Sequence, residues 1–186
     1  STGTATINIT GTGNGTADDD NTGVAILGAT TNLAAKVTSK DGDIVINGNG
    51  GGSASATALR NYGILIGRGT VSSTGLATIT LNATEGSSVT TVLNEAFAMV
   101  GANSFLTSAG SGAVSINANQ MSIDVTPSNA TVDVGTNIIT LSPKTTSRSV
   151  GLGAVDSSSL LGLTDAELDR ITAAGLIQVQ SSSGNV

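Results

Sequence analysis

The strongest local concentration of charge in the chain is a run of three aspartates, Asp18, Asp19 and Asp20. Carboxylate oxygens are preferred ligands of Ca²⁺, so this run is a candidate calcium site. The ligand spacing of an EF-hand loop is absent, and adjacent side chains of an extended segment point in opposite directions. We therefore expect a solvated acidic loop and no bound cofactor, with calcium binding as the alternative.

A second pair of carboxylates, Asp41 and Asp43, shares one face of an extended segment, and Arg68 follows a later strand-like segment. Carboxylates that converge with a basic side chain are what polysaccharide lyases and hydrolases need for acid–base chemistry. Small residues, Ala77 and Ala113, lead into the corresponding segments further along the chain, so no stack of carboxylates is expected. We interpret the aspartates as solvated charges and expect no enzyme.

The overall composition excludes further kinds of chemistry. The chain has no His and no Cys, which removes imidazole and thiolate chemistry. Its net charge is −6, and its 7 basic residues form no block, so nucleic acid is not an expected partner. No apolar run reaches the roughly 18–20 residues of a membrane span, and no leader is recognisable, so we expect a removed leader or an excerpt, and no membrane insertion.

The chain is built on an internal repeat. The tetrapeptides Ile-Val-Ile-Asn at 44–47, Ile-Thr-Leu-Asn at 79–82 and Val-Ser-Ile-Asn at 114–117 recur every 35 residues, and Ile-Asn-Ile-Thr at 7–10 lies 37 residues before the first of them. Such a period predicts one structural unit that stacks on copies of itself.

Alternation within these tetrapeptides predicts which residues stack in the interior. Side chains two apart in a strand share a face, so the aliphatic positions should form continuous inward columns. These positions are Ile7, Ile9, Ile44, Ile46, Ile79, Leu81, Val114 and Ile116. Equivalent positions of successive strands also align Asn47, Asn82 and Asn117 as a ladder of amides.

Each period contains three strand-like segments separated by glycine-rich corners, for example 43–47, 62–66 and 70–73. Gly28, Gly67 and Gly101 each follow the middle segment, where we expect a corner that needs a positive φ.

After about residue 118 the regular pattern gives way to shorter strands and one predicted helix near 165–173. Thr164 is the expected N-cap, Glu167 completes a capping box, Leu168 packs against the strands and Gly175 ends the helix. We expect one domain, 1–186, with regular repeats over 1–117 and shorter strands plus a capping helix over 118–186.

Three motifs in this second part resemble a module of filamentous-haemagglutinin-type exoproteins and adhesins, which are very large secreted bacterial proteins. They are Ile-Thr-Leu-Ser-Pro at 139–143, Ser-Val-Gly-Leu-Gly at 149–153 and Leu-Gly-Leu-Thr-Asp-Ala-Glu-Leu-Asp-Arg-Ile at 161–171. The resemblance implies a right-handed parallel β-helix that is exported through the outer membrane and serves as a fibre, adhesin or surface layer. It carries no catalytic residue onto this chain.

Together these observations predict an all-β protein, a right-handed parallel β-solenoid of about five rungs, where one rung is one three-strand repeat. We expect a structural repeat unit of an extracellular bacterial fibre or surface adhesin. A receptor- or glycan-binding adhesin segment and, less in keeping with the residues, a polysaccharide lyase or hydrolase are the alternatives.

The expected partner is a second copy or a neighbouring segment, with a host or neighbouring-cell surface as a further possibility. Both ends look uncapped, so we expect head-to-tail stacking through Ile7 and Ile9 at one end and Val179 and Val186 at the other.

Overall fold

The computed structural model describes residues 1–15, 20–29, 34–52, 60–87, 95–123 and 130–181. The described residues are nearly all β, with 17 strands and a single short helix. Every strand pairing among them is parallel.

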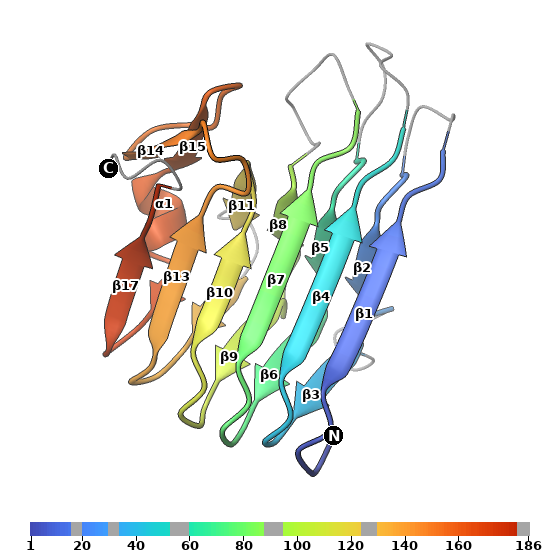
Figure 1. Cartoon of the computed structure of the whole chain (residues 1–186), viewed down its shortest axis with the longest axis vertical. Coiled ribbons are helices and arrows are strands. Elements are labelled where there is room, and N and C mark those ends of the chain that lie inside the picture. Colours follow the sequence, from blue (N-terminus) through green and yellow to red (C-terminus); the bar gives the residue numbers. More distant parts are fainter. Residues whose placement is uncertain (16–19, 30–33, 53–59, 88–94, 124–129, 182–186) are drawn as a thin grey trace.

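Three parallel sheets contain all but two of the strands (Figure 1). Sheet A is formed by Ile7–Thr12 (β1), Ile44–Asn49 (β4), Ile79–Thr84 (β7), Val114–Asn117 (β10), Ile138–Ser142 (β13) and Leu176–Val179 (β17). Sheet B is formed by Val24–Leu27 (β2), Ile64–Gly67 (β5), Phe97–Val100 (β8) and Met121–Ile123 (β11). Sheet C is formed by Lys36–Ser39 (β3), Thr70–Ser73 (β6), Phe105–Ser108 (β9), Thr131–Asp133 (β12) and Ile171–Thr172 (β16).

The chain visits the three sheets in turn. Each of the sets β1–β3, β4–β6, β7–β9 and β10–β12 contributes one strand to each sheet, and each strand pairs with its counterparts in the adjacent sets. Pairing is in register, so Ile44 lies opposite Ile7 on one side and Ile79 on the other. The repeat seen in the sequence is therefore the stacking unit of the structure.

The interior consists of aliphatic columns, as the alternation predicts. Each strand of a sheet contributes one residue to each column. In β4, β7 and β10 the inward positions are fully buried, whereas the outward ones are only partly buried. The buried apolar side chains of sheet A are Ile44, Ile46, Ile79, Leu81, Ala83, Val114, Ile116, Ile139 and Leu141. Each valine, leucine or isoleucine among them contributes roughly 1.5–3 kcal/mol relative to an exposed one, so the columns take the place of a globular core.

The fifth passage through the sheets departs from the pattern. Between β13 in sheet A and β16 in sheet C the chain forms a separate two-stranded sheet, Ser149–Leu152 (β14) with Leu160–Leu163 (β15), and then the helix Asp165–Leu168 (α1). No described residue continues sheet B beyond β11. Sheet B is therefore shorter than its neighbours at this side.

The helix is shorter than predicted. Thr164 is the N-cap and forms the expected capping box with Glu167, but α1 ends at Leu168 with Asp169 as its C-cap. The prediction of a helix to residue 173 with a stop at Gly175 is wrong, because Ile171 and Thr172 pair with β12 instead. Both are β-branched residues, which favour strands, and the open edge of sheet C supplies their backbone partners.

The predicted glycine corners hold only in part. Gly101 has a φ of 82°, as expected after β8. Gly67 is the last residue of β5 and has no positive φ, and neither has Gly28. After β5 the positive φ, 53°, belongs to Arg68.

The face assignment predicts unequal effects of a charge on one strand. Leu81→Asp places an unpaired carboxylate in the interior and should lower the free energy of unfolding by about 3–5 kcal/mol, while Thr80→Asp, on the outer face, should change it by less than about 1 kcal/mol. Thermal unfolding followed by circular dichroism measures both. Equal melting temperatures would contradict the face assignment, and a lower melting temperature in Thr80→Asp would show that the register is inverted.

Candidate functional site: the outer asparagine column and the sheet edges

The outer face of sheet A carries a continuous column of hydrogen-bonded polar side chains. The Asn82 amide Nδ2 donates to Oδ1 of Asn47 at 2.9 Å, and that of Asn117 donates to Oδ1 of Asn82 at 2.8 Å. The column continues to Ser142, whose hydroxyl donates to Asn117 Oδ1 at 2.6 Å, and to Thr10, which lies 3.5 Å from Asn47 Nδ2. All donors point toward the N-terminal strands, an alignment in which each bond polarises the next.

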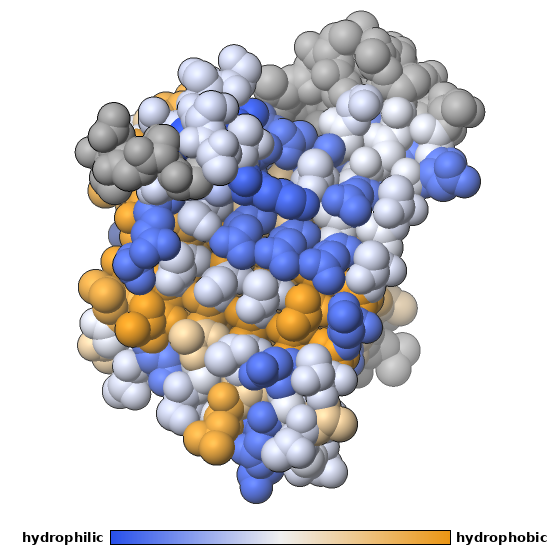
Figure 2. Space-filling view, in the orientation of Figure 1, coloured by the Kyte–Doolittle hydropathy of each residue, from blue (hydrophilic) through white to orange (hydrophobic). Residues whose placement is uncertain are grey.

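This column gives the sheet a hydrated outer surface with few charges. Figure 2 shows a row of hydrophilic residues across the front of the molecule, over the strands of sheet A, and a hydrophobic band below it. The amides bond to equivalent amides in adjacent strands, so a slip by one residue would break the column and expose the aliphatic face. The column therefore favours the observed register over a shifted one.

The N-terminal edge of the stack leaves aliphatic side chains incompletely covered. β1, β2 and β3 are the terminal strands of their sheets. Ile7 and Ile9 of β1 are partly buried, although Ile44 and Ile46, opposite them in β4, are fully buried. One contact covers part of the edge of β3, where the backbone of Ser1 bonds to Thr38 and Lys40. A further strand alongside β1 would complete the burial of its two isoleucines.

On the C-terminal side, no described residue pairs with the outer edge of sheet A or of sheet C. β17 and β16 are the terminal strands there. In β17, Val179 is partly buried and Ile177 and Leu176 remain 36% and 50% exposed. Val186, predicted to take part in stacking, lies outside the described residues.

In sheet B the same side is covered, which corrects the prediction of two uncapped ends. The backbone N–H of Met121 donates to Asp156 Oδ2 at 3.0 Å, and that of Ile123 lies 3.4 Å from Glu167 Oε1. Two carboxylates thus take the place of the next strand for β11. Glu167 also completes the capping box of Thr164, so α1 and the edge cap share one side chain.

Burial changes the acidity of this cap. Burial raises the pKa of Asp156 to about 7, and the Glu167 carboxylate also raises it, against the lowering effects of the Gly162 and Met121 N–H groups and of the Arg148 guanidinium. Arg148 is itself held by the carbonyls of Asn119 and Ser157, at 2.9 and 2.7 Å. The protonation state of the half-buried Asp156 carboxyl is therefore linked to the hydrogen bond that covers the edge of β11.

The predicted acidic candidates do not form a metal site in the described part of the chain. Asp20 forms an ion pair with Arg60, with 2.7 Å between Nε and Oδ1, and Asp18 and Asp19 lie outside the described residues. No group of three acidic side chains suited to a metal ion occurs among the residues that the structure describes.

Asp41 and Asp43 bind the backbone of the next repeat. Asp41 Oδ1 accepts from the Leu76 N–H at 3.1 Å, and Asp43 Oδ1 accepts from the N–H and hydroxyl of Thr78 at 2.9 and 2.8 Å. The Thr78 backbone and hydroxyl bonds lower the pKa of Asp43. These carboxylates lie at the corner between sheets C and A, whereas Arg68 lies at the corner between sheets B and C, so the three do not converge.

Comparison with known proteins adds no relative. No protein-family model, curated protein or solved structure matches the chain. The resemblance to filamentous-haemagglutinin-type exoproteins stays a prediction from the residues that carry it. Within the described ranges, no helix has the length and apolar character needed to cross a membrane.

The carboxylate cap predicts a pH-dependent stability. Because the pKa of Asp156 is raised on folding, folding takes up a proton between about pH 4 and 7, and the free energy of unfolding should fall as pH rises through this range and then level off. Asp156→Asn should remove a fall on the order of 1–3 kcal/mol.

Urea unfolding at pH 5, 6, 7 and 8 measures this difference. Asp133→Asn, a change of an exposed carboxylate on β12, is the control and should follow the unmodified protein. Parallel curves for the unmodified protein and Asp156→Asn would contradict the assignment.

Proposed function

We propose that the chain is a right-handed parallel β-solenoid segment that serves as a structural repeat unit of an extracellular bacterial fibre or surface adhesin. The observation that supports this most directly is the incomplete edge of β1, where Ile7 and Ile9 are less buried than their equivalents in every following strand down to β13. On this proposal, further repeats of the same kind cover that edge, either in a second copy or in a longer polypeptide.

The edge chemistry favours a partner built like the chain itself. A terminal strand offers unpaired N–H and C=O groups, and a partly covered aliphatic column lies behind them. An in-register strand with aliphatic residues at alternate positions satisfies both, and each repeat of this chain supplies one. Such a contact joins two different surfaces and does not close, so it propagates into a fibre.

The two sides of the stack would contribute unequally. On the C-terminal side, β17 and β16 are the last strands of sheets A and C in the described part of the chain, but Asp156 and Glu167 cover β11. We therefore propose that stacking at this side proceeds through sheets A and C, with α1 and β14–β15 beside the junction.

The outer surface suits a rod exposed to water. Asn, Thr and Ser side chains face outward along sheet A and satisfy one another through hydrogen bonds. They hydrate the surface without strong charge, while the parallel ladders and aliphatic columns provide stiffness. The function is mechanical, and no reacting group is required.

A charge at the open edge tests this proposal. Ile9→Lys places an ammonium group in the column at β1 and should abolish self-association, because an incoming strand would have to bury it. Thr12→Lys, on the outer face of the same strand, is the matched control and should associate like the unmodified protein. Light scattering on dilution and electron microscopy of the full chain measure association.

Filaments that are lost in Ile9→Lys and kept in Thr12→Lys are the expected result. The proposal is wrong if the unmodified chain stays monomeric at high concentration and the backbone amides on the outer edge of β1 are protected from hydrogen exchange.

A further inference from the structure

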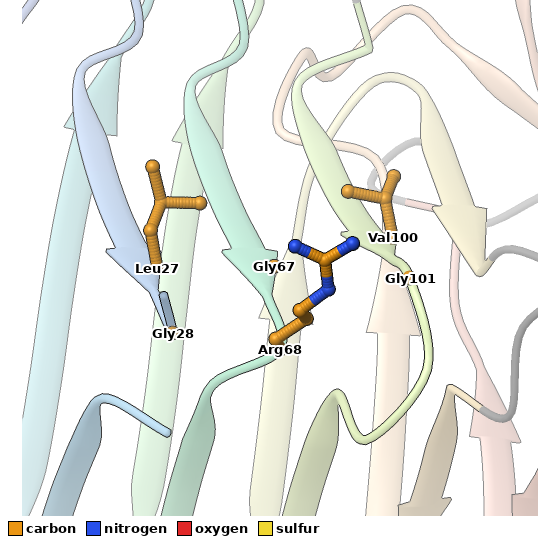
Figure 3. Close-up of a pocket in the computed structure, with 6 residues that line it drawn as sticks. All are labelled: Leu27, Gly28, Gly67, Arg68, Val100 and Gly101. Carbon is orange, nitrogen blue, oxygen red and sulfur yellow. The ribbon is translucent and has the colours of Figure 1, made fainter. Parts of the chain in front are cut away.

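We propose that a groove on the outer face of sheet B binds an aliphatic carboxylate, through Arg68 and the apolar side chains on either side of it. The groove encloses about 310 Å³ and is lined by Leu27, Gly28, Gly67, Arg68, Val100 and Gly101 (Figure 3). Its volume lies at the lower end of the range for small-molecule sites.

The hollow exists because one strand lacks a side chain. Leu27, Gly67 and Val100 lie opposite one another on β2, β5 and β8, and all three occupy outward positions at the ends of their strands. A Cβ on Gly67 would come within 2.8 Å of Leu27 Cδ2 and 3.7 Å of Val100 Cγ2. Two aliphatic walls therefore flank a glycine floor, and Leu27 is 56% exposed although it is apolar.

Arg68 supplies the charge at this groove. Its guanidinium lies between Leu27 and Val100 in Figure 3, turned toward the Val100 side. Within the described part of the chain, this guanidinium forms no hydrogen bond or ion pair, whereas Arg60 and Arg148 are held by carboxylates. A guanidinium presents a planar fork of donors that matches a carboxylate.

The backbone at Arg68 is better suited to glycine than to arginine. Its φ is 53°, a region that side chains with a Cβ rarely adopt, and the equivalent residue of the next repeat is Gly101, with a φ of 82°. The corner is nonetheless well anchored, since the Arg68 N–H donates to Ser104 Oγ at 2.8 Å and that oxygen lies 2.7 Å from the Val100 carbonyl. An arginine held at a position where glycine costs less points to a role in binding.

The lining selects the ligand class. A sugar acid needs hydrogen-bonding partners for its hydroxyls, and among the described residues that line the groove only Arg68 has a polar side chain. An aliphatic carboxylate needs one charged partner and apolar walls, which Arg68, Leu27 and Val100 provide. The structure thus favours a fatty-acid-like ligand over an acidic sugar.

Titration of the full chain with octanoate, followed by the backbone amide resonances, tests this inference. We expect saturable shifts at Gly67, Arg68 and Gly101, with a dissociation constant on the order of 1 mM. Octanol, which lacks the charge, and glucuronate, which lacks the chain, should each bind at least about tenfold more weakly.

Three variants test separately the contributions of the Arg68 charge, of the space above Gly67 and of the backbone conformation at residue 68, and a fourth variant is the control. Arg68→Gln and Gly67→Val should each weaken octanoate binding by about tenfold or more, and Lys36→Gln, which removes an exposed charge outside the groove, should leave it unchanged. Arg68→Gly should lose binding without lowering the melting temperature, because glycine tolerates the positive φ.

Equal binding of octanol, tight binding of glucuronate, or unchanged binding in Arg68→Gln would overturn the proposal. So would a lower melting temperature in Arg68→Gly, which would make Arg68 a structural residue. The titrations are run at concentrations where light scattering shows a monomer, so that assembly into fibres does not broaden the resonances.

Discussion

Every described repeat depends on parallel, in-register hydrogen bonding to the repeat before or after it. A single set of three short strands cannot bury its aliphatic face alone, so the interior exists only where strands stack. Ile46 and Leu81 become fully buried because each lies opposite an equivalent residue in adjacent strands. The composition follows from this constraint, because short aliphatic side chains fill a narrow stack that has no room for many aromatic ones.

The same constraint links structure to the proposed role. Each repeat is stabilised by contacts with the adjacent repeats, so these contacts do not fix the number of repeats in the stack. The terminal strands can form the same backbone hydrogen bonds as the interior strands. Two described edges are partly covered: the Ser1 backbone bonds beside β3, and on β11 the carboxylates of Asp156 and Glu167 occupy the positions of backbone partners. Side chains at the edges therefore determine where a further strand can pair with the stack and where it cannot.

The parts of the fold that could be predicted are those that repeat. The inward face of Leu81 and the amide bond between Asn47 and Asn82 follow from alternation and a constant period. The parts that could not be predicted depend on contacts without a period. The helix ends early because Ile171 finds a partner in sheet C, and Asp156 caps an edge formed 35 residues before it. At the Arg68 corner the glycines indicate a positive φ at Gly67, whereas packing places it one residue later, and the groove beside it has no signal in the sequence.

Deletion of one whole period tests the central claim most directly. Removing residues 44–78 joins two equivalent points of the repeat and would let β1, β2 and β3 pair with β7, β8 and β9. We predict that the shortened chain keeps the circular dichroism spectrum of the full chain and unfolds cooperatively, whereas deletion of 44–61, which removes β4 without β5 and β6, does not. Loss of folded structure in the first deletion, or its survival to the same extent in the second, would contradict the account.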